Sequence, residues 1–128
     1  MNNLIVDAAR DKIFLTLIVD KNIYTCSHEN SKINFEKLMI LINEFLSKNK
    51  NTLNNVHTIY VNRGPGSFAG IRNALATIKA LFLTKKIDYY CFSFEDFVGL
   101  DEVKYEDVPN LCVQFKIKKN LINPIYLS

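Results

Sequence analysis

Residues 62–72 read N-R-G-P-G-S-F-A-G-I-R, and the rest of the chain is organised around them. This stretch holds three of the chain's four glycines and one of its three prolines, so the most flexible and the most restricted backbones meet in one turn. An apolar run at 56–61 leads into the turn, and a helical pattern at 68–83 follows it. The sequence therefore predicts a strand, a tight loop and the N-terminus of a helix.

Size and composition indicate one ordinary globular domain. The chain has 128 residues, of which 48% are hydrophobic and 23% are charged, so wholesale disorder is not expected. The net charge of +3 is mild, and we find no dense Lys/Arg stripe with interleaved aromatics that would predict a nucleic-acid surface. Composition alone does not assign a function.

The three cysteines, Cys26, Cys91 and Cys112, are an odd and widely spaced set in apolar or strand-like surroundings. We interpret them as buried free thiols in a reducing compartment. No apolar run approaches the roughly 18 residues of a membrane span, and no secretory signal pattern begins the chain. We expect a cytoplasmic protein without membrane contact.

Hydrophobic periodicity predicts the order of elements. Strands are expected at 4–7, 13–19, 23–26, 56–61 and 87–92, and helices at 35–46, 68–83 and about 94–100. The order is βββαβαβ followed by a helix, which is an α/β fold with a mixed sheet. We expect this unit to occupy residues 1–100. Residues 101–128 are expected to form a short C-terminal β segment, with strands at 111–117 and 121–127 pairing as a hairpin.

Both main helices have unusually wide apolar surfaces. In the first, the apolar positions Phe35, Leu38, Met39, Leu41, Ile42, Phe45 and Leu46 cover an arc of roughly 160°. Either this helix is wedged between sheet and loops, or it also meets a partner. In the second, bulky residues form one face and Ala69, Ala76 and Ala80 line the opposite side. We expect another helix to pack closely on the alanine side.

The loop from Gly64 to Gly70 is the best candidate site. Its glycines permit close approach of another backbone, Pro65 stiffens the turn, and Ser67 can cap the helix. A helix N-terminus attracts anions, and Arg63 and Arg72 could strengthen that attraction. The loop lacks the Lys-Ser/Thr ending of a P-loop and the spacing of a dinucleotide turn, so a plain structural turn is the preferred interpretation.

Catalytic and metal chemistry have little support in the sequence. Ser67 has no evident base, because His28 lies in a loop pattern and His57 enters a strand. Neither histidine nor any cysteine has the spacing of metal ligands. Asp7, which ends the first expected strand, is most often a structural residue in such a turn. We predict no catalytic residue and no metal site.

The segment G-P-G-S-F-A-G-I-R, Gly64 to Arg72, closely resembles the G-P-G-S-F-T-G-x-R signature of the TsaB (YeaZ) family. The flanking segments L-I-V-D-A-A at 4–9, S-F-E-D-F at 93–97 and P-I-Y-L at 124–127 are similar to its opening strand, its Ser-Thr-Leu segment and its ending. That family supports synthesis of N6-threonylcarbamoyladenosine at position 37 of tRNA. The loop match is specific and covers nine residues; the wider resemblance covers about residues 1–100.

The resemblance implies a single actin-like (ASKHA, Hsp70-like) lobe in a shortened protein, and a non-catalytic role beside a TsaD-type enzyme. A TsaE-type ATPase is a further partner of the family, and contact with tRNA would be indirect. No cofactor is expected, because the residues after Asp7 supply no phosphate-binding glycine or hydroxyl. The family-motif positions are Gly64, Pro65, Gly66, Ser67, Phe68, Gly70 and Arg72. The implied partner interface comprises Phe35, Met39, Ile42, Leu46, Ala69, Asn73, Ala76 and Ala80.

Two other functions stay open at this point. The chain could be a small anion-binding or nucleotide-binding enzyme of kinase-like fold that uses the Gly64 to Gly70 loop. It could also be a self-associating structural protein, because the same apolar helices can pair with a second copy.

Overall fold

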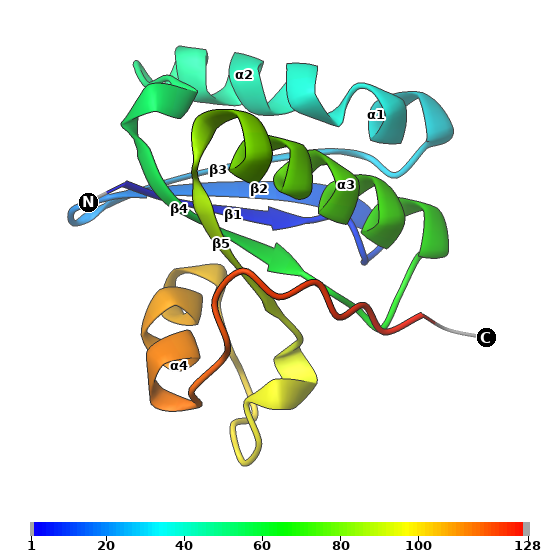
Figure 1. The fold of residues 1–128 in the computed structure, drawn as a ribbon, viewed down its shortest axis with the longest axis vertical. Coiled ribbons are helices and arrows are strands. Elements are labelled where there is room, and N and C mark those ends of the chain that lie inside the picture. Colours follow the sequence, from blue (N-terminus) through cyan, green and yellow to red (C-terminus); the bar gives the residue numbers. More distant parts are fainter. Residues whose placement is uncertain (1, 127–128) are drawn as a thin grey trace.

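A five-stranded mixed sheet forms the centre of the molecule. The computed structural model describes residues 2–126, and its sheet has the order β3-β2-β1-β4-β5 (Figure 1). Strands β1 (Asn2–Asp7), β2 (Lys12–Val19) and β3 (Asn22–Glu29) pair antiparallel. Strands β4 (Val56–Asn62) and β5 (Asp88–Phe92) add in parallel beside β1. The predicted order of strands and the α/β fold class with a mixed sheet are confirmed.

Alternation along the strands gives the sheet two different faces. In β1, Leu4 and Val6 belong to the larger hydrophobic cluster, whereas Ile5 between them belongs to the smaller one. Helices α1 (Lys32–Glu36), α2 (Leu38–Lys48) and α3 (Phe68–Lys85) cover the larger cluster. Figure 1 shows these three helices on one side of the sheet, with α4 (Val108–Gln114) on the other. We call the two sides the helix face and the C-terminal face.

The single helix predicted at 35–46 is divided in the structure. Ser31 caps α1 by accepting a hydrogen bond from the backbone N–H of Asn34, and Lys37 then departs from helical geometry before α2 begins. The break turns the short α1 so that Phe35 lies against the start of α3. Periodicity alone does not detect a one-residue interruption, because the hydrophobic pattern continues through it.

The predicted C-terminal hairpin is wrong. Residues 108–114 form helix α4, preceded by the short 3₁₀ turns η2 (Phe94–Asp96) and η3 (Tyr105–Asp107). The apolar residues Val108, Leu111 and Cys112 recur at helical spacing and bury one side of α4 against the C-terminal face. Pro109 fits the first turn of this helix. Residues 121–126 form no regular strand, and Leu127 lies outside the described residues.

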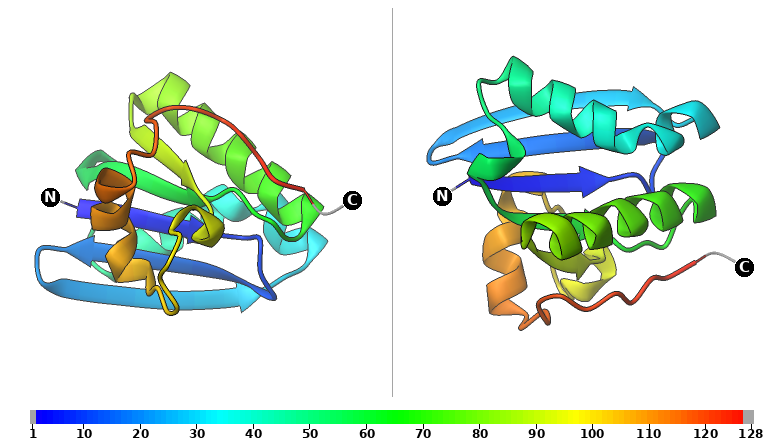
Figure 2. Two further views of the ribbon diagram at one scale, coloured as in Figure 1. Left: turned by 90° about the horizontal axis from the view of Figure 1, so that it is seen from below. Right: turned by 45° about the horizontal axis from the view of Figure 1, so that its top comes forward.

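The C-terminal segment, residues 117–126, runs along the edge of β5 and returns to the start of α3 (Figure 2). Asn120 and Tyr89 exchange two hydrogen bonds, in which each backbone N–H donates to an oxygen of the other residue, at 2.8 and 2.9 Å. Ile125 N–H donates to Arg63 O at 2.7 Å, and the Tyr126 ring lies 4.7 Å from that of Phe68. These contacts cover an edge strand that would otherwise expose unpaired backbone groups. None of the helices between residues 2 and 126 is long and apolar enough to span a membrane.

Candidate functional site

The loop after β4 is held by the strand that precedes it. The Gly64 N–H donates to Asn62 Oδ1 at 2.9 Å, and the Gly64–Pro65 peptide is cis. Gly64 has a φ of 109°, a conformation that side chains rarely adopt. Arg63 turns away from the loop and donates two hydrogen bonds to the Asp96 carboxylate, at 2.6 and 3.3 Å. Arg63 therefore does not add positive charge to an anion site here.

The other two loop glycines allow the β1–β2 turn to approach closely. A Cβ atom placed on Gly66 would lie 2.0 Å from Ala9 O, and one on Gly70 would lie 1.8 Å from Ala8 O. The Ser67 N–H donates to Ala9 O, and Ser67 Oγ accepts from the Gly70 N–H as the helix cap. One of the N–H groups at this helix start is thus already taken by a protein carbonyl. The sequence motif fixes the corner between strand and helix.

Asp7 is covered by a residue far away in the sequence. It is fully buried, its Oδ1 accepts from the Ala9 N–H, and its Oδ2 accepts from the Tyr105 hydroxyl at 2.7 Å. Burial, followed by the adjacent Asp7, raises the pKa of Tyr105 above its ordinary value. The sequence offered no signal for this pairing, because 98 positions separate the two residues.

The two histidines do not assemble a catalytic site with Ser67. His57 lies at the beginning of β4, whereas Ser67 follows the end of that strand. His28 instead contacts Cys26, with 3.7 Å between Nε2 and Sγ. Among residues 2–126, no three His, Cys, Asp or Glu side chains group as metal ligands would.

A groove of about 680 Å³ lies between α1 and α3, and we call it the helical groove. Its lining comprises Lys32, Phe35, Glu36, Phe68, Ala69, Arg72, Asn73 and Ala76. Four residues of the interface implied by the resemblance therefore meet here, together with two residues of the loop motif. Ala69 and Ala76 are exposed, as is Ala80 farther along the helix. No part of the described chain covers this alanine side, so the expected helix partner does not come from within residues 2–126.

Part of the implied interface is not at the surface. Ile42 and Leu46 are 0% exposed and belong to the cluster between the helices and the sheet. Met39 is half-buried against the same cluster. The wide apolar arc of the first helix is thus explained by its position over the sheet, and the prediction that Ile42 and Leu46 contact a partner is corrected by their burial.

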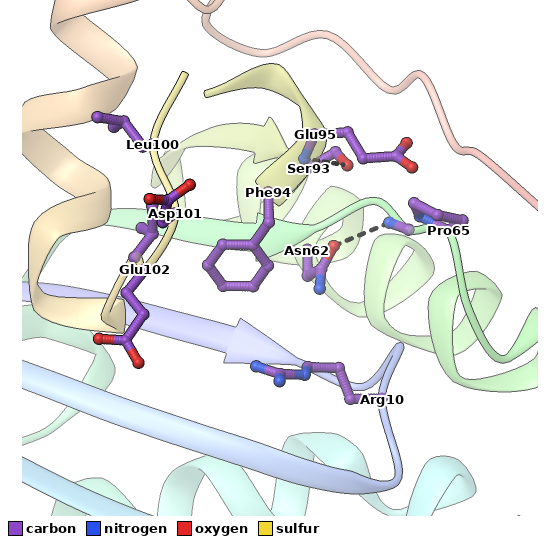
Figure 3. A pocket seen from close by; sticks show the side chains of 11 residues that line it. Arg10, Asn62, Pro65, Ser93, Phe94, Glu95, Leu100, Asp101 and Glu102 are labelled. Carbon is purple, nitrogen blue, oxygen red and sulfur yellow. Dashed lines mark hydrogen bonds between the residues drawn. The ribbon is translucent and has the colours of Figure 1, made fainter. Parts of the chain in front are cut away.

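A second cavity, of about 460 Å³, opens at the carboxyl ends of β1, β4 and β5, and we call it the sheet-end pocket (Figure 3). Asn62 and Ser93 line it from the strand ends, Arg10 from the β1–β2 turn, and Asp101 and Glu102 from the connection before η3. Ligands of open α/β sheets commonly bind beyond the carboxyl ends of the strands. The sequence does not reveal this cavity, because its walls come from four separate parts of the chain.

Comparisons with known proteins agree with the fold and the loop motif. The profile of the family described as "TsaD: tRNA N6-adenosine threonylcarbamoyltransferase" matches residues 28–94, slightly more than half of the chain. The tRNA threonylcarbamoyladenosine biosynthesis protein TsaB of Buchnera aphidicola subsp. Baizongia pistaciae is 36% identical over 80 residues, which are 52% of this chain and 36% of that protein. The TsaB of Buchnera aphidicola subsp. Schizaphis graminum is 29% identical over 90 residues, which are 70% of this chain and 43% of that protein.

The solved structure of YeaZ from Pseudomonas aeruginosa superposes with a TM-score of 0.66 at 20% sequence identity. The superposition covers 72% of this chain and 43% of that one. The chain thus spans less than half the length of the curated relatives it matches and of this structural neighbour. The similarity in structure establishes the fold, and the sequence matches carry the family.

Proposed function

The chain belongs to the TsaB (YeaZ) family, and from this premise we propose that it is a non-catalytic subunit in the biosynthesis of tRNA N6-threonylcarbamoyladenosine. In this proposal it binds a TsaD-type enzyme through the helical groove and holds that enzyme in a competent conformation. It acts in the cytoplasm and contacts tRNA only through its partner. The modification chemistry belongs to the partner.

The observation that carries the proposal is the uncovered alanine side of α3. Ala69 and Ala76 are exposed on an 18-residue helix, and small side chains allow a second helix to approach closely. Beside them, Phe68 is 53% exposed and offers an aromatic anchor of the kind that dominates interfaces. Such a surface is suited to a partner protein.

The loop supports the non-catalytic part of the proposal. Ser67 Oγ caps α3, and no basic side chain within residues 2–126 hydrogen-bonds to it, while Tyr105 covers the Asp7 carboxylate. The rival interpretation as an anion-binding enzyme requires free N–H groups at this helix start, and the carbonyl of Ala9 already accepts from Ser67. The geometry therefore favours a role in assembly.

Titration calorimetry with the TsaD-type enzyme of the same organism tests the proposal. We expect saturable binding at micromolar concentration, weakened at least about tenfold by Ala76→Arg, because a long charged side chain would fill the groove. Leu83→Arg is the matched control: it lies on the same helix, is 62% exposed and does not line the groove. Absence of binding, or equal losses in both variants, would contradict the proposal.

The chain without its enzyme provides a second readout. The same groove can pair with a second copy, so size-exclusion chromatography should show self-association that Ala76→Arg reduces and Leu83→Arg preserves. In a depleted strain, the wild-type chain and Leu83→Arg should restore the modified nucleoside, whereas Ala76→Arg should not. Failure of a stably expressed wild-type chain to restore it would favour a structural protein outside tRNA modification.

A further inference from the structure

The two edges of the sheet are treated differently by the chain. The C-terminal segment covers the edge at β5, where Lys119 forms a bridge with Tyr90. The opposite edge is β3, and in both views of Figure 2 no described segment continues the sheet beyond it. A strand paired on one side only turns alternate backbone N–H and C=O groups outward. The outer side of β3 therefore presents a row of hydrogen-bonding groups that another strand can use.

Strand β3 lacks the features by which edge strands usually prevent such pairing. Its eight residues pair one to one with β2, without a bulge. Their sequence, N-I-Y-T-C-S-H-E, contains no proline, glycine or lysine, and its only acidic or basic residue apart from His28 is the terminal Glu29. Ile23 and Tyr24 are 42% and 37% exposed, and side chains of these types favour extended strands. This edge is suited to an added strand.

The charges at the two ends of β3 fit a second copy of the same strand. When two copies pair antiparallel about a two-fold axis at Thr25, Lys21 of each copy lies opposite Glu29 of the other. Within one chain, Glu29 already lies opposite Lys12 of β2, so each carboxylate would lie between two ammonium groups. The pairs between these ends are Asn22 with His28, Ile23 with Ser27, Tyr24 with Cys26, and Thr25 with itself.

The neighbouring registers lose this complementarity. Residues that pair across two strands lie on the same face of the sheet, so the axis can move only by whole residues along β3. An axis at Tyr24 would place Lys21 opposite Ser27, and an axis at Cys26 would place it opposite Ser31. Only the register centred on Thr25 matches both ends by charge.

We propose that β3 pairs antiparallel with β3 of a second copy about a two-fold axis at Thr25. The contact joins two five-stranded sheets into one continuous sheet. This inference goes beyond the proposed function and does not depend on it, because no residue of β3 lines the helical groove. The groove and the strand edge are separate surfaces, and each can be removed by its own substitution.

Sedimentation velocity of the full chain carrying Ala76→Arg tests the pairing without self-association through the groove. We expect a dimer whose fraction rises with concentration in the micromolar range. Adding Thr25→Lys should raise the dissociation constant at least about tenfold, because two ammonium groups would meet at the axis. Thr84→Lys is the matched control, since it places the same side chain at another exposed threonine, outside β3. A monomer at every concentration, or equal effects of the two lysines, would overturn the proposal.

Disulfide trapping tests the register. In a Cys26→Ala background, Thr25→Cys should form a covalent dimer on mild oxidation, because the two copies of this residue face each other within the range of a disulfide. Ile23→Cys in the same background is the control. Its two copies would lie about 13 Å apart, too far for a bond. The remaining thiols, Cys91 and Cys112, are buried. No trapping of Thr25→Cys, or equal trapping of both variants, would contradict this register.

Charge reversal tests the ends of the strand. Lys21→Glu should weaken the dimer several-fold, because it places two carboxylates opposite each other at each end. Adding Glu29→Lys should restore most of the lost affinity by recreating the opposite-charge pair in reverse. A double variant that dimerises no better than Lys21→Glu alone would refute the pairing of these two residues.

Discussion

The two faces of the sheet are covered in different ways. On the helix face, three helices of regular periodicity bury the larger hydrophobic cluster, and glycines bring backbones into contact. On the C-terminal face, short turns and the seven-residue α4 bury a smaller cluster through ring contacts, including Phe92 with Phe97 and Phe97 with Phe115. Regular packing leaves an open groove for a partner on the first face. On the C-terminal face, contacts between side chains that are far apart in the sequence cover the sheet.

The largest effect should come from the glycine contacts of the helix face. Gly70→Ala places a Cβ against the Ala8 carbonyl, so the free energy of unfolding should fall by about 3 kcal/mol in a urea titration. Gly99→Ala is the counterpart beside the C-terminal face, where no atom lies within 4 Å and only the positive φ of 89° is strained. Its cost should be about 1 kcal/mol. Equal losses at the two positions would contradict the distinction.

Alkaline pH should test one thiol on each face. Burial raises the pKa of Cys91 on the helix face to about 11 and that of Cys112 on the C-terminal face to about 12, from an ordinary value of 9.0. The unfolded thiols ionise first, so their contribution to stability is complete below pH 9 and is lost as the pH rises toward the folded values. Between pH 8 and 10 we expect a loss of about 2 kcal/mol for the pair.

Single alanine variants show how much each thiol contributes to the loss of stability between pH 8 and 10. Cys91→Ala and Cys112→Ala should each remove about half of the pH dependence measured by urea midpoints over this range. A slope that is unchanged in the double variant would show that the thiols do not cause it.

Tyr105→Phe should show how much the hydrogen bond between the C-terminal face and the end of β1 contributes to stability. The substitution removes the hydroxyl that donates to the buried Asp7 carboxylate but keeps the ring beside Phe14 and Phe94. Because a buried oxygen of Asp7 loses its hydrogen-bond donor, stability should fall by about 2 kcal/mol in thermal or urea unfolding. Phe94→Leu, which changes a neighbouring ring without a hydrogen bond, is a packing control. A negligible effect of Tyr105→Phe would mean that water replaces the hydroxyl.

A smaller loss is expected where the C-terminal segment meets β5. Asn120→Ala removes the side chain that accepts from the Tyr89 N–H and donates to Asp88, but it retains the backbone bond to Tyr89 O. We expect about 1 kcal/mol, with faster amide exchange confined to Tyr89. Exchange that accelerates throughout the sheet would indicate a larger structural role for this contact.

The difference between local patterns and long-range contacts explains which parts of the structure the sequence could predict. The strand, loop and helix around Gly64 to Gly70 are specified locally, by an apolar run, a Ser cap and a helical period. The alternation of Val113, Phe115 and Ile117 predicts a strand where the structure has the end of α4, although Val108, Leu111 and Cys112 have a helical spacing. The contact from Tyr105 to Asp7 depends on tertiary structure, which local patterns do not encode.

The residues predicted to contact a partner also differ in whether they lie at the surface. The alanine side of α3, which the wheel predicts to be covered by another helix, is exposed in the described part of the chain. Ile42 and Leu46, which were expected at the partner interface, are buried because the helix that carries them lies directly over the sheet. A wide apolar arc predicts that other residues pack on a helix. Only the fold shows whether those residues belong to the same chain.

Hydroxyl-radical footprinting of the chain, alone and with the TsaD-type enzyme, tests most directly which face receives the partner. Phe68 at the helical groove is 53% exposed, whereas Val98 and Val113 beside the C-terminal face are 79% and 75% exposed. We expect complex formation to slow the oxidation of Phe68 several-fold and to leave the oxidation of both valines unchanged. A stable complex in which Phe68 reacts as before, or in which the valines are protected instead, would contradict it.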